Sequence, residues 1–215
     1  MTAARRIDGR LARGEASRNA ILEQAVRIAS VEGLDALSIG GLAGLLDVSK
    51  SNVFSLFGSK EELQLAAIRY ASSIFAHQVV EPVFEVAPGI DRVTRMYDVW
   101  LEYSRKRVFP GGCFFFKVTT EYASREGRVH DALADIRREW VALQERVIGD
   151  AIQLGQLSAG TDPAQLAFEL DAIAKAANAD ATLWDDDMAY QTAAVAIRNR
   201  ISAVARAGRS GFRRN

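Results

Sequence analysis

Residues 38–63, SIGGLAGLLDVSKSNVFSLFGSKEEL, decide the fold of this chain. The segment predicts two short helices separated by a tight turn at Asp47 and Val48, with a third helix close behind them. Ser38 carries a hydroxyl that can cap the first helix. That helix would bury three apolar side chains at helical spacing: Ile39, Leu42 and Leu45. Two short helices in this order are the sequence form of a helix-turn-helix that reads DNA.

The second short helix divides its residues between an inner and an outer face, and Ser49 can cap it. The inner face would hold Val53 together with Leu56 or Phe57. The outer face would hold the polar residues Lys50, Ser51, Asn52 and Ser55. Ser59 and Glu62 then form the pattern S-x-x-E, in which each side chain caps an N-terminal amide of the next helix. The third helix is therefore expected to begin at Lys60.

The same residues resemble the TetR family of transcriptional regulators, in which a helix-turn-helix is followed by a Phe, a short turn and a Lys at the start of the fourth helix. The matching residues here are Val48-Ser49-Lys50, Phe57 and Ser59-Lys60-Glu61-Glu62-Leu63. The resemblance covers roughly residues 17–65, and beyond them only length and helical pattern agree. It implies an all-α protein with an N-terminal three-helix head and a C-terminal helical bundle for ligand binding and dimerisation.

Two positions depart from the family pattern. Asp47 stands in the turn where the family usually has Gly; a left-handed backbone there would cost Asp some free energy, and its carboxylate adds negative charge near DNA. Phe54 stands where the family often has Tyr, so the ring is kept but a hydroxyl that could donate to a phosphate is lost. Three glycines, Gly40, Gly41 and Gly44, each disfavour the first short helix by about 1 kcal/mol relative to Ala, so packing must hold it.

The candidate DNA contacts fall into two groups. The candidates for reading base edges are Lys50, Ser51, Asn52 and Ser55. In the major groove Lys can bond guanine and Asn can pair with adenine. The candidates for phosphate contacts are Lys60, through its charge, and Ser38, beside a helix N-terminus. The remaining candidates are Ser49 and Phe54. The alternative for these polar residues is an ordinary solvated helix face.

The composition is that of an ordinary globular protein, with 49% hydrophobic and 25% charged residues among 215. The 27 basic residues balance 27 acidic ones, which argues weakly against nucleic acid, although the distribution of charge matters more than its total. The single cysteine excludes a disulfide framework, and no signal-peptide core or membrane-spanning run is found. We therefore expect a cytoplasmic protein with no membrane association, cofactor or metal site.

The chain divides into four predicted segments. Residues 1–16 combine several arginines with little apolar content. They predict a flexible basic arm that could reach phosphates or a narrow minor groove, with a merely solvated tail as the alternative. Residues 17–62 form the helix-turn-helix domain, residues 63–207 the ligand-binding and dimerisation domain, and residues 208–215 a disordered tail.

Apolar periodicity and turn residues predict the helix boundaries. The first and fourth helices are expected over Ser17–Val31 and from Lys60 to about His77. A loop is expected at Pro82, Pro88 and Gly89. Later helices are expected over about 90–107, 113–127, 129–154, 163–184 and 186–207. Asp162-Pro163-Ala164-Gln165 is a compact start signal, with Asp as the cap and Gln reaching back.

The last two helices are rich in Ala, and small side chains let helices approach closely. They predict a four-helix interface between two copies of the chain, with burial inside one subunit as the alternative. The apolar residues that flank them are Leu166, Leu170, Ile173, Ala177, Val195, Ile197 and Ile201. The resemblance also implies an inducer pocket among the middle helices. Its candidate residues are Trp100, Tyr103, Cys113, Phe116, Tyr122, Trp140 and Phe168, each of which could instead be plain core.

Together these features predict a ligand-responsive DNA-binding regulator rather than an enzyme. It would be a homodimer on a palindromic double-stranded operator, with recognition helices about 34 to 36 Å apart. A small, largely apolar effector would release this repressor by changing the spacing of its heads, with the fourth helix as the connector. One alternative is a dimeric small-molecule-binding module with a degenerate DNA head. Another is a helical-bundle enzyme that uses Cys113 with His130 or Glu121, although it lacks a base-orienting group, a phosphate loop or a metal spacing.

Overall fold

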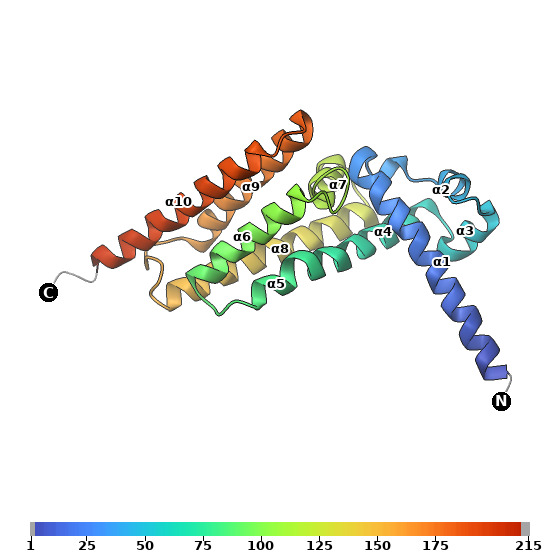
Figure 1. The fold of residues 1–215 in the computed structure, drawn as a ribbon, viewed down its shortest axis with the longest axis horizontal. Coiled ribbons are helices and arrows are strands. Elements are labelled where there is room, and N and C mark those ends of the chain that lie inside the picture. Colours follow the sequence, from blue (N-terminus) through green and yellow to red (C-terminus); the bar gives the residue numbers. More distant parts are fainter. Residues whose placement is uncertain (1–2, 212–215) are drawn as a thin grey trace.

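The computed structural model describes the backbone of residues 3–211 and the side chains of residues 14–205. Over this part all regular structure is helical, which confirms the predicted fold class. Figure 1 shows an elongated molecule, with α1, α2 and α3 at one end and a bundle of longer helices forming the rest. None of the helices in the described residues is both long and apolar enough to cross a bilayer.

The head begins with a helix that is longer than the sequence predicts. Its elements are α1 (Ala3–Glu32), the 3-10 helix η1 (Leu34–Ala36), α2 (Ile39–Leu45) and α3 (Lys50–Phe57). The helix expected from Ser17 thus begins at Ala3, and the backbone of residues 3–16 continues α1 where a flexible arm was expected. The early part of α1 projects away from the head (Figure 1). The side chains of residues 1–13 lie outside the described part, so a DNA contact by this arm stays a prediction.

The core of the head packs the two short helices against each other and against their neighbours, α2 against α1 and α3 against α4. Leu42 of α2 and Val53 of α3 are both fully buried in this core. Ile39 is partly buried, as its spacing predicts. The prediction for Leu45 was wrong: it is 59% exposed, because the last turn of α2 presents Ala43 to the core instead. Packing of α2 against α3 and α1 therefore compensates for the poor helix propensity of the three glycines.

The bundle follows the predicted order of helices with small shifts. Its elements are α4 (Lys60–Phe75), the π-helical turn η2 (Ala76–Val80), α5 (Glu81–Phe84), α6 (Ile90–Arg105), α7 (Phe114–Tyr122), α8 (Arg128–Gln153), α9 (Pro163–Trp184) and α10 (Met188–Gly211). Pro82 does not open a loop, because it lies in the first turn of α5, which directly continues the π-helical turn η2. The tail expected over 208–215 continues as helix to Gly211, and residues 212–215 lie outside the described part.

The start of α9 matches its predicted cap only in part. A carboxylate oxygen of Asp162 accepts hydrogen bonds from the N–H groups of Ala164, at 2.8 Å, and Gln165, at 3.3 Å. The Gln165 side chain does not reach back to the cap, because its amide donates to Glu169 one turn further on. The helix therefore starts as predicted, with Asp162 alone satisfying the exposed amides.

The loop before α7 lies against the end of α1. A Cβ added to Gly111 would lie 1.9 Å from the carbonyl oxygen of Ser30, so only glycine allows this approach. Gly112 has a φ of +82°, and the next residue, Cys113, donates its N–H to the buried side chain of Asn178 at 2.9 Å. The Pro-Gly-Gly stretch is therefore more than a helix breaker, because it docks α7 between the head and α9.

Candidate DNA interface and effector cavity

The helix-turn-helix is fixed by three serine caps. The hydroxyl oxygens of Ser38, Ser49 and Ser59 accept the N–H groups of Gly41, Asn52 and Glu62 at 3.0, 3.2 and 3.1 Å, respectively. All three caps form as the sequence predicts. Asp47 in the turn has a φ of 52°, so this position is left-handed and tolerates Asp at some cost. The second half of the predicted capping box does not form, because the Glu62 carboxylate accepts from Arg128.

The outer face of α3 carries the predicted base-reading residues. Lys50, Ser51, Asn52 and Ser55 are all exposed, while Val53 and Phe57 are buried. The Ser55 hydroxyl donates to the Asn52 carbonyl at 2.7 Å, and Ser51 shares a hydrogen bond with Ser49. Within the described residues, the side chains of Lys50 and Asn52 form no hydrogen bond or ion pair. These two side chains can therefore change conformation to meet a base edge without breaking an internal contact.

The remaining DNA candidates border this face. The Phe54 ring is 56% exposed and cannot donate a hydrogen bond. Ser38 is exposed beside the first turn of α2. Lys60 is exposed too, but its ammonium donates to the carbonyl oxygen of Asp35 at 2.6 Å. One of its three N–H groups is thus used inside the head, which leaves two for a phosphate.

A set of polar contacts ties the head to the bundle, and we call it the joint: Leu34, Asp35, Gln64, Glu121, Tyr122 and Arg125. The Glu121 carboxylate at the end of α7 accepts two backbone N–H groups from the start of η1, Leu34 at 2.7 Å and Asp35 at 2.9 Å. A Cβ on Gly33 would lie 2.5 Å from this carboxylate, so glycine is needed for the approach. The last turn of α7 therefore caps a helix of the head, and sequence spacing gave no sign of it.

Tyr122, a candidate for the inducer pocket in the sequence, places its hydroxyl in the joint instead. Its hydroxyl donates to the Asp35 carboxylate at 3.1 Å and accepts a hydrogen bond from the side-chain amide of Gln64, also at 3.1 Å. Burial and the bond to Asp35 raise the pKa of Tyr122 to about 12, so it stays a donor at neutral pH. The Arg125 guanidinium bonds the same Asp35 carboxylate and helps to lower its pKa.

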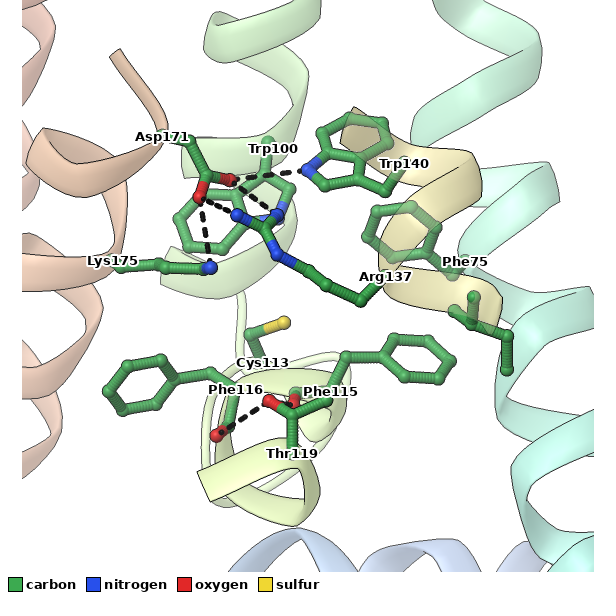
Figure 2. Close-up of a pocket in the computed structure, with 11 residues that line it drawn as sticks. Phe75, Trp100, Cys113, Phe115, Phe116, Thr119, Arg137, Trp140, Asp171 and Lys175 are labelled. Carbon is green, nitrogen blue, oxygen red and sulfur yellow. Dashed lines mark hydrogen bonds and ion pairs between the residues drawn. The ribbon is translucent and has the colours of Figure 1, made fainter. Parts of the chain in front are cut away.

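A small, partly open cavity of about 50 Å³ lies between α4, α6, α7, α8 and α9 (Figure 2). Its aromatic lining consists of Phe75, Trp100, Phe115, Phe116 and Trp140. The Phe75 ring meets those of Phe115 and Trp140 edge-on, at centroid distances of 5.6 and 5.1 Å. Its other lining residues are Cys113, Thr119, Ile136, Arg137, Asp171 and Lys175. Four of the residues predicted for a pocket are brought together here: Trp100, Cys113, Phe116 and Trp140.

One end of the cavity carries charge, which the sequence analysis missed. Arg137 of α8 and Lys175 of α9 approach one oxygen of the Asp171 carboxylate, at 2.7 and 2.9 Å. The Trp140 indole N–H donates to the other oxygen of this carboxylate at 3.3 Å. Burial opposes ionisation of Asp171, but the two cations outweigh it and keep the pKa of its carboxyl below the ordinary value. A signal existed, since Asp171 and Lys175 are one turn apart in a helix that is otherwise mostly apolar.

Besides Tyr122, two predicted pocket residues do not line this cavity. Tyr103 is buried beside the cavity, where its ring meets Phe75 edge-on at 5.5 Å, but it does not line the cavity. Phe168 is 69% exposed on the outer side of α9. Aromatic content alone could not tell the residues that line the cavity from those that do not, because aromatic rings occur in cores, in cavity walls and at intersubunit faces.

Cys113 is a packing residue in this arrangement. Its side chain is buried, and burial raises the pKa of the thiol to about 11, so little thiolate exists at neutral pH. The two bases considered for an enzyme are engaged elsewhere in the described part of the chain: His130 contacts Asp131, and Glu121 holds η1. This geometry gives no support to a nucleophilic cysteine.

The outer faces of α9 and α10 carry exposed small and apolar residues at helical spacing. On α9 these are Phe168, Ala172, Ala176 and Leu183, and on α10 they are Met188, Thr192 and Val195. Of the flanking residues named from the sequence, five are buried inside the subunit: Leu166, Leu170, Ala177, Ile197 and Ile201. The two helices therefore have one face for the subunit core and a second, different face open to solvent.

Two family models match the chain, one in each half. The model for bacterial regulatory proteins of the tetR family matches residues 21–67, which include the helix-turn-helix. The model for the tetracycline repressor-like C-terminal domain matches residues 89–197, which include most of the bundle. A search of curated protein sequences gives no match. The two matches together cover the head and the cavity-bearing part.

Solved structures share the fold at low sequence identity. A TetR transcriptional regulator from Chloroflexus aurantiacus is 20% identical with a TM-score of 0.82, covering 88% of this chain and 96% of that one. AibR, solved with isovaleryl coenzyme A and operator DNA, is 19% identical with a TM-score of 0.68, covering 87% and 97%. A protein from Saccharomonospora viridis in complex with choline is 20% identical with a TM-score of 0.74, covering 87% and 96%. These likenesses extend over the head and bundle together.

Proposed function

The chain belongs to the TetR family of bacterial regulatory proteins and is a ligand-responsive DNA-binding transcriptional regulator, and from this premise we propose how it works. We propose that a homodimer binds a palindromic operator in the cytoplasm as a repressor and leaves it when a small molecule occupies the cavity between α7, α8 and α9. The observation that carries the proposal is the joint, because it connects a cavity helix to the head through named hydrogen bonds.

The proposed DNA contacts follow from the exposed face of α3. Lys50 and Asn52 would read base edges, since both side chains are exposed and uncommitted within the described structure. Ser51, Ser55, Ser49 and Phe54 would border them. Lys60 and Ser38 would meet the phosphates, Lys60 with its two remaining N–H groups and Ser38 beside the N-terminus of α2.

The proposed dimer uses the solvent-facing sides of α9 and α10. Their exposed residues are small or apolar at successive turns, which lets two helices pack closely against their copies. Two-fold symmetry would then set the two α3 helices about one turn of DNA apart, roughly 34 to 36 Å. A monomer at micromolar concentration, by analytical ultracentrifugation, would contradict this assembly.

The proposed signal travels through α7 as well as α4. The first turn of α7 lines the cavity with Phe115 and Phe116, and its last turn holds η1 through Glu121. α4 offers a second connection, since Phe75 lines the cavity at its end and Lys60 lies at its start. An effector that shifts α7 would therefore pull on the linker between α1 and α2, which changes the orientation of the head.

The test is selection of genomic DNA fragments by the purified full-length protein, followed by titration of a selected fragment at several salt concentrations. An intact head predicts a palindromic consensus and an affinity that falls steeply with salt while sequence preference remains. Failure to bind any double-stranded fragment even at low salt would favour the alternative, a ligand-binding module with a degenerate head. Formation of all three serine caps weighs against that alternative.

A further inference from the structure

The cavity has two chemically different ends. Figure 2 shows Arg137, Asp171 and Lys175 grouped at one end, with Phe115, Phe116 and Thr119 of α7 at the other. The Thr119 hydroxyl is bonded to carbonyl groups of its own helix, so the α7 end offers mainly aromatic surface. A molecule that fills this space therefore meets charge at one end, where the Trp140 indole is bonded to Asp171, and only the uncharged, mainly aromatic surface of α7 at the other.

The charged end carries one positive charge in excess. Among the described residues that line the cavity, Arg137 and Lys175 are the cations and Asp171 is the carboxylate. The Asp171 side chain is only 9% exposed, whereas the side chains of Arg137 and Lys175 are 34% and 32% exposed, so water screens this cluster only in part. A cationic ligand would add a third positive charge here, whereas an anionic ligand would neutralise the excess.

Donors for an anion remain on both cations. The Asp171 carboxylate accepts one N–H from each of the two terminal nitrogens of Arg137 and one from the ammonium of Lys175. Arg137 has five N–H groups and Lys175 has three, so donors remain on both. The free edge of a guanidinium suits the two oxygens of a carboxylate. An incoming carboxylate could therefore join the cluster without expelling Asp171.

The aromatic end limits the size and shape of the rest of the ligand. Its rings would pack against a flat or compact apolar body. The cavity holds about 50 Å³ as it stands, whereas an apolar cavity of roughly 150 Å³ accepts benzene. A ligand with a ring would displace part of this lining or extend past it, and two of the lining helices, α7 and α4, connect to the head.

From these observations we infer that the effector is a compact monoanion, a carboxylate with an aromatic or short branched apolar body, bound with its charge at Arg137 and Lys175. The inference rests on the proposed function, since it names the ligand class of the same cavity. Five rings would also suit a quaternary ammonium ion by cation–π attraction. The excess positive charge argues against that ligand, and the experiment includes it.

The test measures binding to the full-length dimer by calorimetry with matched probes: benzoate, phenylacetate and isovalerate, the amide of each, and benzyltrimethylammonium. Each carboxylate should bind about tenfold or more tightly than its amide, because the neutral amide differs only in losing the charge-assisted hydrogen bonds. Quenching of tryptophan fluorescence locates the site, because Trp100 and Trp140 line the cavity while Trp184 is 64% exposed. Amides that bind as well as acids, tighter binding of the ammonium ion, or no carboxylate binding at about 10 mM would each overturn the inference.

Two variants separate charge recognition from a structural effect. Lys175→Met removes the excess charge and should reduce the acid-to-amide affinity ratio about tenfold, whereas a purely structural loss would weaken acid and amide alike. Lys117→Met is the matched control, because Lys117 is exposed on the outer side of α7 and does not line the cavity. An unchanged ratio in Lys175→Met, or an equal drop in the control, would count against the assignment.

Binding of the ligand in the cavity and release of the DNA fragment are measured separately. If a carboxylate binds with the expected preference but leaves a selected DNA fragment bound, the ligand class stands and the proposed release mechanism fails. If DNA is bound specifically but only neutral or cationic probes bind in the cavity, the regulator proposal stands and the ligand class is wrong.

Discussion

The outer face of α3 and the charged end of the cavity are both built from polar side chains, but these are held in opposite ways. Lys50 and Asn52 lie on a helix of eight residues with no bond from either side chain in the described structure. Arg137 of α8 and Lys175 of α9 both bind the carboxylate of Asp171. A DNA-reading face gains from uncommitted side chains, whereas an effector site gains from side chains that hold their position until a ligand joins them.

This difference predicts that substitutions in the cavity change stability first, while substitutions on α3 change DNA affinity first. The largest effect is expected for Asp171→Asn. Removing the partner of two partly buried cations should lower the free energy of unfolding by up to about 3 kcal/mol. Urea titration at neutral pH measures this loss, and a loss below about 0.5 kcal/mol, typical of a surface site, would break the comparison.

The same variant has a defined pH dependence. The pKa of Asp171 is lowered in the folded protein, so its ionised form contributes stability above its ordinary pKa, and that contribution is lost as pH falls through the lowered value. The gap in unfolding free energy between wild type and Asp171→Asn should therefore be constant at neutral pH and narrow in acid below about pH 4. If the difference in unfolding free energy widened in acid instead, the ionised Asp171 carboxylate would not be the stabilising form.

On α3, Asn52→Ala should cost about 1 to 3 kcal/mol of operator affinity, or roughly 5- to 150-fold, and relax sequence preference. Its melting temperature should stay close to that of wild type, because the side chain is exposed. Lys60→Ala should instead weaken all DNA about equally. If both variants reduce binding to every sequence to the same extent, Asn52 does not read a base.

The joint is where the two regions meet, and Glu121→Gln tests it. Its carboxylate accepts two backbone N–H groups from η1, so loss of its charge should cost about 1 to 2 kcal/mol of stability and loosen the head from α7. Glu126→Gln is the matched control, since Glu126 is exposed just after α7. Thermal unfolding of both variants and DNA release by an effector measure the effect, and identical behaviour of the pair would exclude a role for α7.

The smallest effect is a gain. Phe54→Tyr adds a hydroxyl to an exposed ring of α3 at a position where the family often has Tyr. One new hydrogen bond to a phosphate should add about 0.5 to 1.5 kcal/mol, or roughly 2- to 10-fold, to the affinity for all DNA. Electrophoretic mobility shifts on the selected fragment and on unrelated DNA check it. A gain confined to the selected fragment would mean that the ring faces a base instead.

The head was predictable because its decisive interactions are local. Each serine cap joins residues three apart in the chain, and the left-handed turn at Asp47 lies between two short helices. The local structure of residues 38–63 is therefore set by interactions within that segment. The errors there came from tertiary contacts. The Glu62 carboxylate forms an ion pair with Arg128 of α8 instead of capping its own helix. Ala43, and not Leu45, is buried in the core.

The cavity and the joint could be predicted only in fragments. Trp100, Phe116 and Trp140 were named from aromatic content and do line the cavity, as does the candidate Cys113, but Tyr122 and Phe168 were named on the same grounds and do not. Arg137 and Asp171 of the ion cluster are 34 residues apart, and the residues bonded by Glu121 are 86 and 87 positions away from it. No spacing rule relates such positions, because their neighbourhood depends on how five helices pack.

The sequence by itself determined that this protein is all helical and carries a capped helix-turn-helix, because hydrophobic period, caps and turn residues act over a few neighbours along the chain. The tertiary structure alone decided that the cavity has a charged end and that α7 joins it to the head. Burial changes the energy of charges and hydrogen bonds, and burial is set by contacts between segments far apart in sequence.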